Sequence, residues 1–111
     1  MLAILSVTVS SAKSEVLADN MSAYDMTVNF RSLSRYLELS AQQEEVMELI
    51  HEYFCRDMRV AARKHDDERS LKTTKAINRN LSYVHSYLDA KQYHKYVTLL
   101  NVTLNNRGIK I

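Results

Sequence analysis

The sequence predicts an all-α fold in which a short helix is followed by a long helical hairpin and a C-terminal helix, forming a three- to four-helix bundle. Its 111 residues include one glycine and no proline, although the turns of β-rich and α/β proteins draw on both residues. After residue 28, apolar residues recur at helical spacing. A short polar residue that can cap a helix precedes each periodic run.

The composition is that of one ordinary globular domain. Hydrophobic residues make up 46% of the chain and charged residues 25%, so the chain can bury a modest core without metals or disulfides. Cys55 is the only cysteine, which excludes an intrachain disulfide and a multi-cysteine zinc site. The formal net charge of +2 is too small to indicate a nucleic acid or a membrane partner by itself.

The first twelve residues, MLAILSVTVSSA, resemble the second half of a secretory signal peptide. They carry no charge and are apolar from Leu2 to Val9, and they end in small residues of the kind found at signal-peptidase sites. We expect a truncated signal, with the true start further upstream, and export to the periplasm or beyond. The alternatives are a β-prone tail and a cytoplasmic protein. The apolar stretch is too short to span a bilayer.

Residues 13–27 show no sustained period and are expected to form a flexible tether. The helical domain would then cover residues 28–111. Asn29 can cap a short helix that ends near Glu38. Ser40 and Gln43 have the spacing of a capping box for a long helix over residues 41–64. Its expected apolar face comprises Val46, Ile50, Tyr53, Phe54, Met58, Ala61 and Ala62.

Two more helix starts follow. Asp67 is the expected cap of a third helix, antiparallel to the second, with an apolar face of Leu71, Ile77, Leu81, Val84 and Leu88. Asp89 and Gln92 form a second capping-box pattern. The last helix then has Tyr93, Tyr96, Val97, Leu100 and Leu104 on its apolar face, and Gly108 stands where a left-handed C-terminal cap is wanted.

One short phrase occurs twice, as YLELSAQQEEV from Tyr36 and as YLDAKQYHKYV from Tyr87. Both copies are helix starts, and the physics of capping explains most of their likeness. The alternative is an internal duplication.

The two copies also resemble the Leu-Thr-x-x-Gln signature of small periplasmic chaperones related to Spy and CpxP. Leu39 to Gln43 matches with Ser in place of Thr, and Leu88 to Gln92 matches with Asp. The C-terminal segment KQYHKYVTLLNVTLNNRG more closely resembles a group of small exported all-helical bacterial proteins of unknown function. That likeness spans about Tyr24 to Ile109. It implies a fold and a compartment but no activity.

Few side-chain combinations suggest chemistry. His51 and Cys55 are four residues apart and could share a metal, but a buried cysteine beside a partly buried histidine explains them better. The run of His65, Asp66, Asp67 and Glu68 is more typical of a solvated loop than of a metal site. His85 and Asp89 could pair across one helical turn. We expect no catalytic residue, cofactor or metal, and therefore a non-enzymatic protein.

Charge is distributed unevenly along the expected hairpin. Five glutamates and no cation lie between Glu38 and Glu52, whereas from Arg56 to Arg79 eight cations against four carboxylates give a net charge of +4. Two trios of cations repeat at helical spacing and form a candidate surface for an anionic partner: Arg56, Arg59, Arg63, Lys72, Lys75 and Arg79. The alternative is a solvated face whose charges follow the helix dipole.

The sequence therefore indicates an exported, non-enzymatic helical protein of the bacterial envelope, acting as an interaction or chaperone-like module with a protein partner. The alternative is a cytoplasmic helical module that binds nucleic acid, or acts in regulation, through the basic Arg56 to Arg79 hairpin. A nucleic-acid partner is the less expected of the two.

Overall fold

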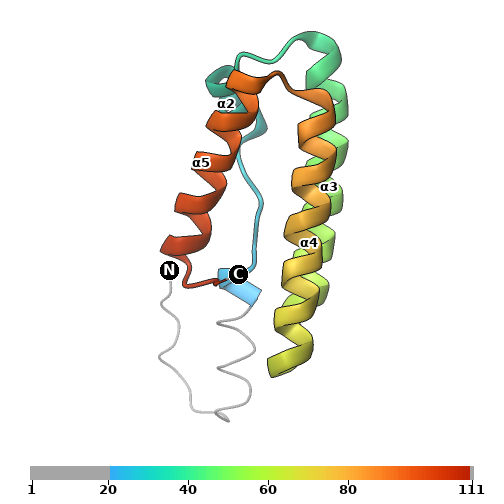
Figure 1. Cartoon of the computed structure of the whole chain (residues 1–111), viewed down its shortest axis with the longest axis vertical. Coiled ribbons are helices and arrows are strands. Elements are labelled where there is room, and N and C mark those ends of the chain that lie inside the picture. Colours follow the sequence, from blue (N-terminus) through green and yellow to red (C-terminus); the bar gives the residue numbers. More distant parts are fainter. Residues whose placement is uncertain (1–20, 111) are drawn as a thin grey trace.

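The computed structural model describes residues 21–110, and all regular structure in this part of the chain is helical (Figure 1). The elements are α2 (Phe30–Leu37), α3 (Ala41–Ala62), α4 (Asp66–Tyr87) and α5 (Ala90–Asn106), and residues 21–23 are also helical. The all-α class, the long hairpin and the C-terminal helix predicted from the sequence are confirmed. The predicted signal segment, residues 1–12, lies outside the described residues.

The antiparallel hairpin of α3 and α4 forms one side of the molecule, and α2 and α5 lie on the other (Figure 1). Each long helix has 22 residues. Ala61, Ala62 and Ala76 are buried, and their small side chains let the two helices approach closely. The largest side chains that are almost fully buried come from α2, α3 and α4: Leu37, Met47, Met58, Ile77 and Val84.

Two residues predicted on apolar faces lie on the surface instead. Tyr53 is 39% exposed and Leu71 is 55% exposed. An α-helix turns by 100° per residue, so Tyr53 points well away from its buried neighbour Phe54. Leu71 lies about 200° around α4 from the buried Thr73, which places it on the opposite side. Met47, which the predicted face omits, is 1% exposed.

The start of α4 also differs from the prediction. The helix begins at Asp66, with His65 at the N-cap position and no side-chain capping bond, rather than after Asp67. Asp66, Asp67 and Glu68 all lie in its first turn, where negative charge interacts favourably with the helix dipole. The predicted cap is therefore part of the helix. In addition, α3 ends at Ala62, slightly before the predicted Lys64.

Both predicted capping boxes are present, and they meet. The backbone amide of Gln43 donates to the Ser40 side chain, and that of Gln92 donates to Asp89. The Gln43 Nε2 atom lies 2.8 Å from Gln92 Oε1, and the reverse bond measures 3.0 Å. The repeated phrase therefore brings the N-termini of α3 and α5 together through a reciprocal glutamine pair, Gln43 and Gln92.

The glutamine pair also binds the ends of the other two helices. Gln92 Nε2 lies 3.2 Å from the carbonyl oxygen of Leu37 and 3.1 Å from that of Glu38, where α2 ends. Gln43 Nε2 donates to the carbonyl of Tyr87 at the end of α4. The last carbonyl groups of a helix lack hydrogen-bond donors within that helix. The glutamine pair supplies donors to such carbonyls at the ends of α2 and α4.

Further along, a buried polar contact joins α5 to α4, and the predicted glycine caps the C-terminus of α5. Asn80 Nδ2 donates to the Tyr96 hydroxyl over 2.6 Å, and burial raises the pKa of Tyr96 to about 12. Gly108 has a φ of +71°, as a left-handed cap requires. The amide of the buried Ile109 then donates to the carbonyl of Leu104.

Candidate functional site

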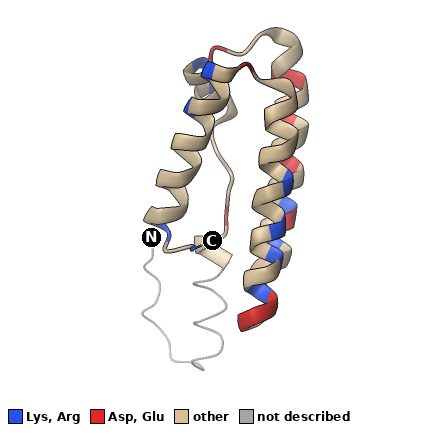
Figure 2. Ribbon diagram, in the orientation of Figure 1, with Lys and Arg blue, Asp and Glu red and all other residues tan. Residues whose placement is uncertain are grey.

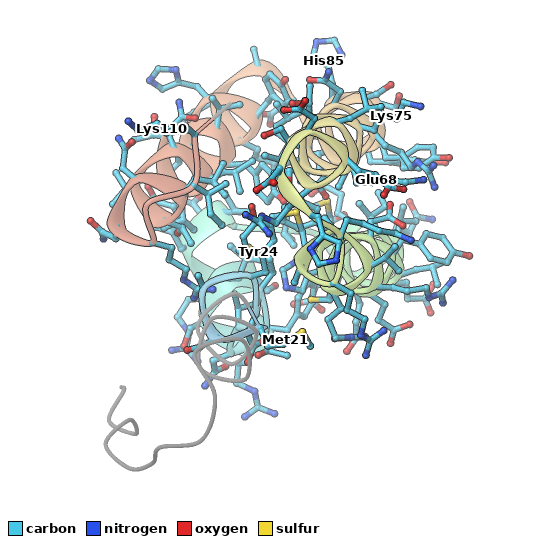
Figure 3. All side chains as sticks on the ribbon, turned by 90° about the horizontal axis from the view of Figure 1, so that it is seen from below. Met21, Tyr24, Glu68, Lys75, His85 and Lys110 are labelled. Carbon is cyan, nitrogen blue, oxygen red and sulfur yellow. The ribbon has the colours of Figure 1, made fainter. Side chains whose placement is uncertain are left out.

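An extended segment, residues 24–29, lies between α5 and the hairpin; we call it the strap (Figure 1). Viewed along the helices, Tyr24 lies among them (Figure 3). Tyr24 is 9% and Met26 only 3% exposed, whereas Asp25 and Thr27 face solvent. This alternation is that of extended chain with one buried face. The buried residues fall within the expected tether, and the only sequence signal for them is this brief alternation.

Side chains of α3, of α4 and of the residue after α5 bind the strap and the residue before it, largely through main-chain atoms. His51 Nε2 of α3 donates to the carbonyl oxygen of Met26 over 2.7 Å. Arg107, which follows α5, donates through Nη1 to the carbonyl oxygens of Ala23 and Asp25. The hydroxyls of Tyr24 and Thr73 on α4 are 3.3 Å apart, within hydrogen-bonding distance.

The two ring nitrogens of His51 have different surroundings. Because a carbonyl can only accept, Nε2 must carry a proton, and in the neutral ring Nδ1 is then an acceptor. Nδ1 is buried and has no hydrogen-bond partner among the described residues. Burial lowers the pKa of His51 below its usual 6.5, and the bond to Met26 partly opposes that shift. His51 is therefore neutral in the folded protein near neutral pH.

This arrangement predicts acid sensitivity. The unfolded chain gains a proton at His51 near pH 6.5, before the folded chain does, so the free energy of unfolding falls as the pH drops below about 6.5. The charged and titratable groups near His51 are Asp25, Glu48, Glu52, Cys55, Arg56, Arg59, Tyr96 and Arg107. In urea titrations at pH 7 and pH 5, H51Q should lose part of the pH dependence that the wild type shows.

The matched control is H94Q, because His94 is exposed on α5. It should keep the full pH dependence of the wild type. Equal pH dependence in the wild type and H51Q would show that His51 does not determine acid stability.

Two hollows flank His51. The first, which we call the α3 cleft, has a volume of about 870 Å³ open to solvent and lies between α3 and residues 27–30. The second, which we call the apolar pocket, has a volume of about 400 Å³, part of it open to solvent, and lies between the strap, α2, α3 and α5. Val28 and His51 line both. Phe54, Leu99 and Leu100 are among the other residues of the apolar pocket.

The α3 cleft has opposite charges at its two ends. Glu48 and Glu52 line one end, and Arg56 and Arg59 line the other. They belong to a single stripe on α3 with spacings of three and four residues, formed by Glu45, Glu48, Glu52, Arg56, Arg59 and Arg63. The acidic half of this stripe comes first, and the basic half follows.

Uncharged side chains line the same cleft. Val28, Phe30, His51 and Cys55 also line the cleft. Cys55 is 6% exposed, and burial raises the pKa of its thiol while Arg59 opposes the shift. Because the thiolate is the reactive form of cysteine, this shift lowers the reactivity of Cys55, which packs like a small apolar side chain.

Basic and acidic residues are intermingled on the hairpin that carries the six predicted cations (Figure 2), but the structure separates the two trios. Arg56 and Arg59 line the α3 cleft, and Arg63 continues their stripe. Arg79 instead pairs with Asp57 over 3.6 Å, and Asp57 is rotated by about 100° around α3 from Arg56.

Lys72 and Lys75 are exposed and share the helical spacing of Arg79. Figure 3 shows Lys75 pointing outward from α4. The α4 trio therefore faces away from the cleft, and the two trios do not form one continuous basic surface.

The two other predicted combinations, His65 to Glu68 and His85 with Asp89, also lie within residues 21–110. No group of three or more His, Cys, Asp or Glu side chains could bind a metal ion there. The His85 ring packs edge-on against Tyr93, with 4.8 Å between ring centroids. No helix in this range has the length and apolarity needed to cross a bilayer.

No protein-family model, curated protein or solved structure matches this chain. The resemblance to exported helical proteins and to Spy-related chaperones therefore stays a prediction from the sequence.

Proposed function

We propose that this chain is a non-enzymatic, chaperone-like interaction module that binds segments of other polypeptides in the α3 cleft. The supporting observation is that side chains of opposite charge line one cleft together with uncharged side chains: Glu48 and Glu52 come first along α3, and Arg56 and Arg59 follow. A complementary segment has one large apolar residue, a Lys or Arg on one side of it and an Asp or Glu on the other. Such segments are common in unfolded proteins.

The same arrangement favours a polypeptide over a nucleic acid. A nucleic acid carries negative charge at every nucleotide, and its affinity depends on how many phosphates the protein neutralises. Along the α3 stripe, a strand long enough to contact Arg56, Arg59 and Arg63 would approach Glu52 and Glu48 on the same face. Repulsion between these glutamates and the phosphates offsets part of the attraction to the arginines. A polypeptide of mixed charge is instead attracted at both the acidic and the basic end of the cleft.

We further propose that the protein acts after export. Support comes from the signal-like composition of residues 1–12 and from the resemblance to exported proteins. The N-terminus of the protein purified from its native host checks this proposal. A mature chain that begins near Lys13 agrees with it, and an intact Met1 in the cytosolic fraction contradicts it.

The functional test is suppression of client aggregation. The wild type should slow the aggregation of a reduced, unfolding model protein, followed by light scattering at several molar ratios. The variant R56E/R59E should lose most of this effect, because it makes the basic end of the cleft acidic. The matched control, K72E/K75E, introduces the same change of charge on exposed positions of α4, and it should retain the activity of the wild type.

Three results would contradict the proposal. Suppression could be absent in the wild type, it could survive in a folded R56E/R59E, or both variants could lose it equally. Equal loss would point to general basic charge rather than to the cleft. Circular dichroism of each variant confirms that it is folded before the comparison is made.

A further inference from the structure

We infer that the groove beneath the strap is itself a binding site for extended polypeptide, and that the strap is its resident intramolecular ligand. His51 and Val28 line both the α3 cleft and the apolar pocket, so the two hollows adjoin each other. If the strap leaves, the two hollows are open to one continuous occupant. This inference deepens the proposed function by naming a second contact region and a mechanism that limits access to it.

The way in which the strap is bound supports the inference. His51 of α3 and Arg107 after α5 bind carbonyl oxygens of Met26 and Asp25 in the strap and of Ala23 just before it, and every residue of any polypeptide carries a carbonyl. His51 and Arg107 can therefore bind another extended chain without regard to most of its sequence. Recognition through main-chain groups combined with a few side-chain pockets is a known mode of binding extended peptides.

Two side chains of the strap define what the groove selects. Met26 is 3% exposed and also lines the apolar pocket. Tyr24 is buried at 9% exposure, with its hydroxyl beside Thr73. A competing segment should therefore carry a large flexible apolar residue at the position of Met26 and an aromatic residue two positions earlier. This spacing places both side chains on one face of an extended chain.

The strap does not seal the groove. Val28 lines both hollows but is 48% exposed, so a competitor can reach the groove from solvent at this position. However, a tethered ligand has a high effective concentration, in the millimolar range for short linkers. A free peptide should therefore bind the intact protein weakly, and weakening the strap should raise its apparent affinity.

The experiment uses a fluorescent peptide with the sequence of residues 22–30, SAYDMTVNF, and the full-length chain. The variant M26A, which weakens the resident strap, should bind this peptide at least about tenfold more tightly than the wild type does. Adding H51F or R107Q to M26A should reverse the gain, since each removes a donor to strap carbonyls. A control peptide with Ser at the positions of Tyr24 and Met26 should bind none of these proteins.

A second measurement covers the case in which M26A does not fold. With methionine methyl groups labelled in the wild type, a large excess of the peptide should move the Met26 signal from its packed position toward that of an unfolded chain. The inference is overturned if folded M26A binds the peptide no more tightly than the wild type. It is equally overturned if a saturating excess of the peptide leaves the Met26 signal unchanged.

These outcomes are distinct from failure of the proposed function. Charge reversal at Arg56 and Arg59 tests the α3 cleft, whereas the strap peptide tests His51, Arg107 and the apolar pocket. A protein that suppresses aggregation but does not bind the strap peptide would keep the proposed function and lose this inference.

Discussion

Replacing Gln92 by leucine should destabilise the protein by about 2–4 kcal/mol, although leucine is apolar and similar in size. Gln92 is 8% exposed, and its side chain accepts from the amide of Asp89 and contacts Gln43 and the last carbonyls of α2. Each hydrogen bond contributes about 1 kcal/mol net, and a buried group left without a partner costs about 1–3 kcal/mol. Several such groups lose their partner at once in this variant.

Urea unfolding at neutral pH measures this loss. The matched control is Q42L, because Gln42 is exposed one residue before the pair, and it should change the free energy of unfolding by less than about 0.5 kcal/mol. The double variant Q43L/Q92L should cost less than the sum of its single changes, because neither glutamine then lacks its partner. If Gln92→Leu lowers the free energy of unfolding by less than about 1 kcal/mol, the glutamine pair does not contribute substantially to the stability of the helix packing.

Replacing Met58 by alanine should cost about 2–5 kcal/mol. Met58 is 0% exposed near the C-terminal end of α3, so the substitution leaves a cavity that the surrounding helices can close only in part. The control is L71A, since Leu71 is 55% exposed and should lose less than about 1 kcal/mol. Thermal or urea unfolding of both variants gives the comparison. Equal losses would contradict the orientation that the structure gives to α4.

That contrast shows where sequence reasoning succeeded and where it failed. Ser40, Gln43, Asp89 and Gln92 were predicted correctly because a capping box depends on neighbours within one turn. Leu71 was predicted in the core because it is apolar, but helical rotation places it on the surface. Asn80 was missed for the opposite reason, because its burial depends on Tyr96, sixteen residues further along the chain.

The candidate site was less predictable than the helices. Arg56 and Arg59 were identified from their spacing, but nothing local in the sequence shows that they border a cleft with Glu48 and Glu52 or that Arg79 faces elsewhere. Those relations depend on how α3 is rotated against α4 and on where residues 27–30 lie. The strap was also missed, since its burial is produced by contacts with His51, Thr73 and Arg107, which are distant in the sequence.

The most direct test of the central claim compares two labelled partners of equal length at about 0.15 M salt. One is a permanently unfolded polypeptide with apolar residues and mixed charge, and the other is a single-stranded oligonucleotide. Fluorescence anisotropy with the full-length protein should show saturable binding of the polypeptide and none of the oligonucleotide. Binding of the oligonucleotide, with no binding of the polypeptide, would contradict the account and favour the basic hairpin as a nucleic-acid surface.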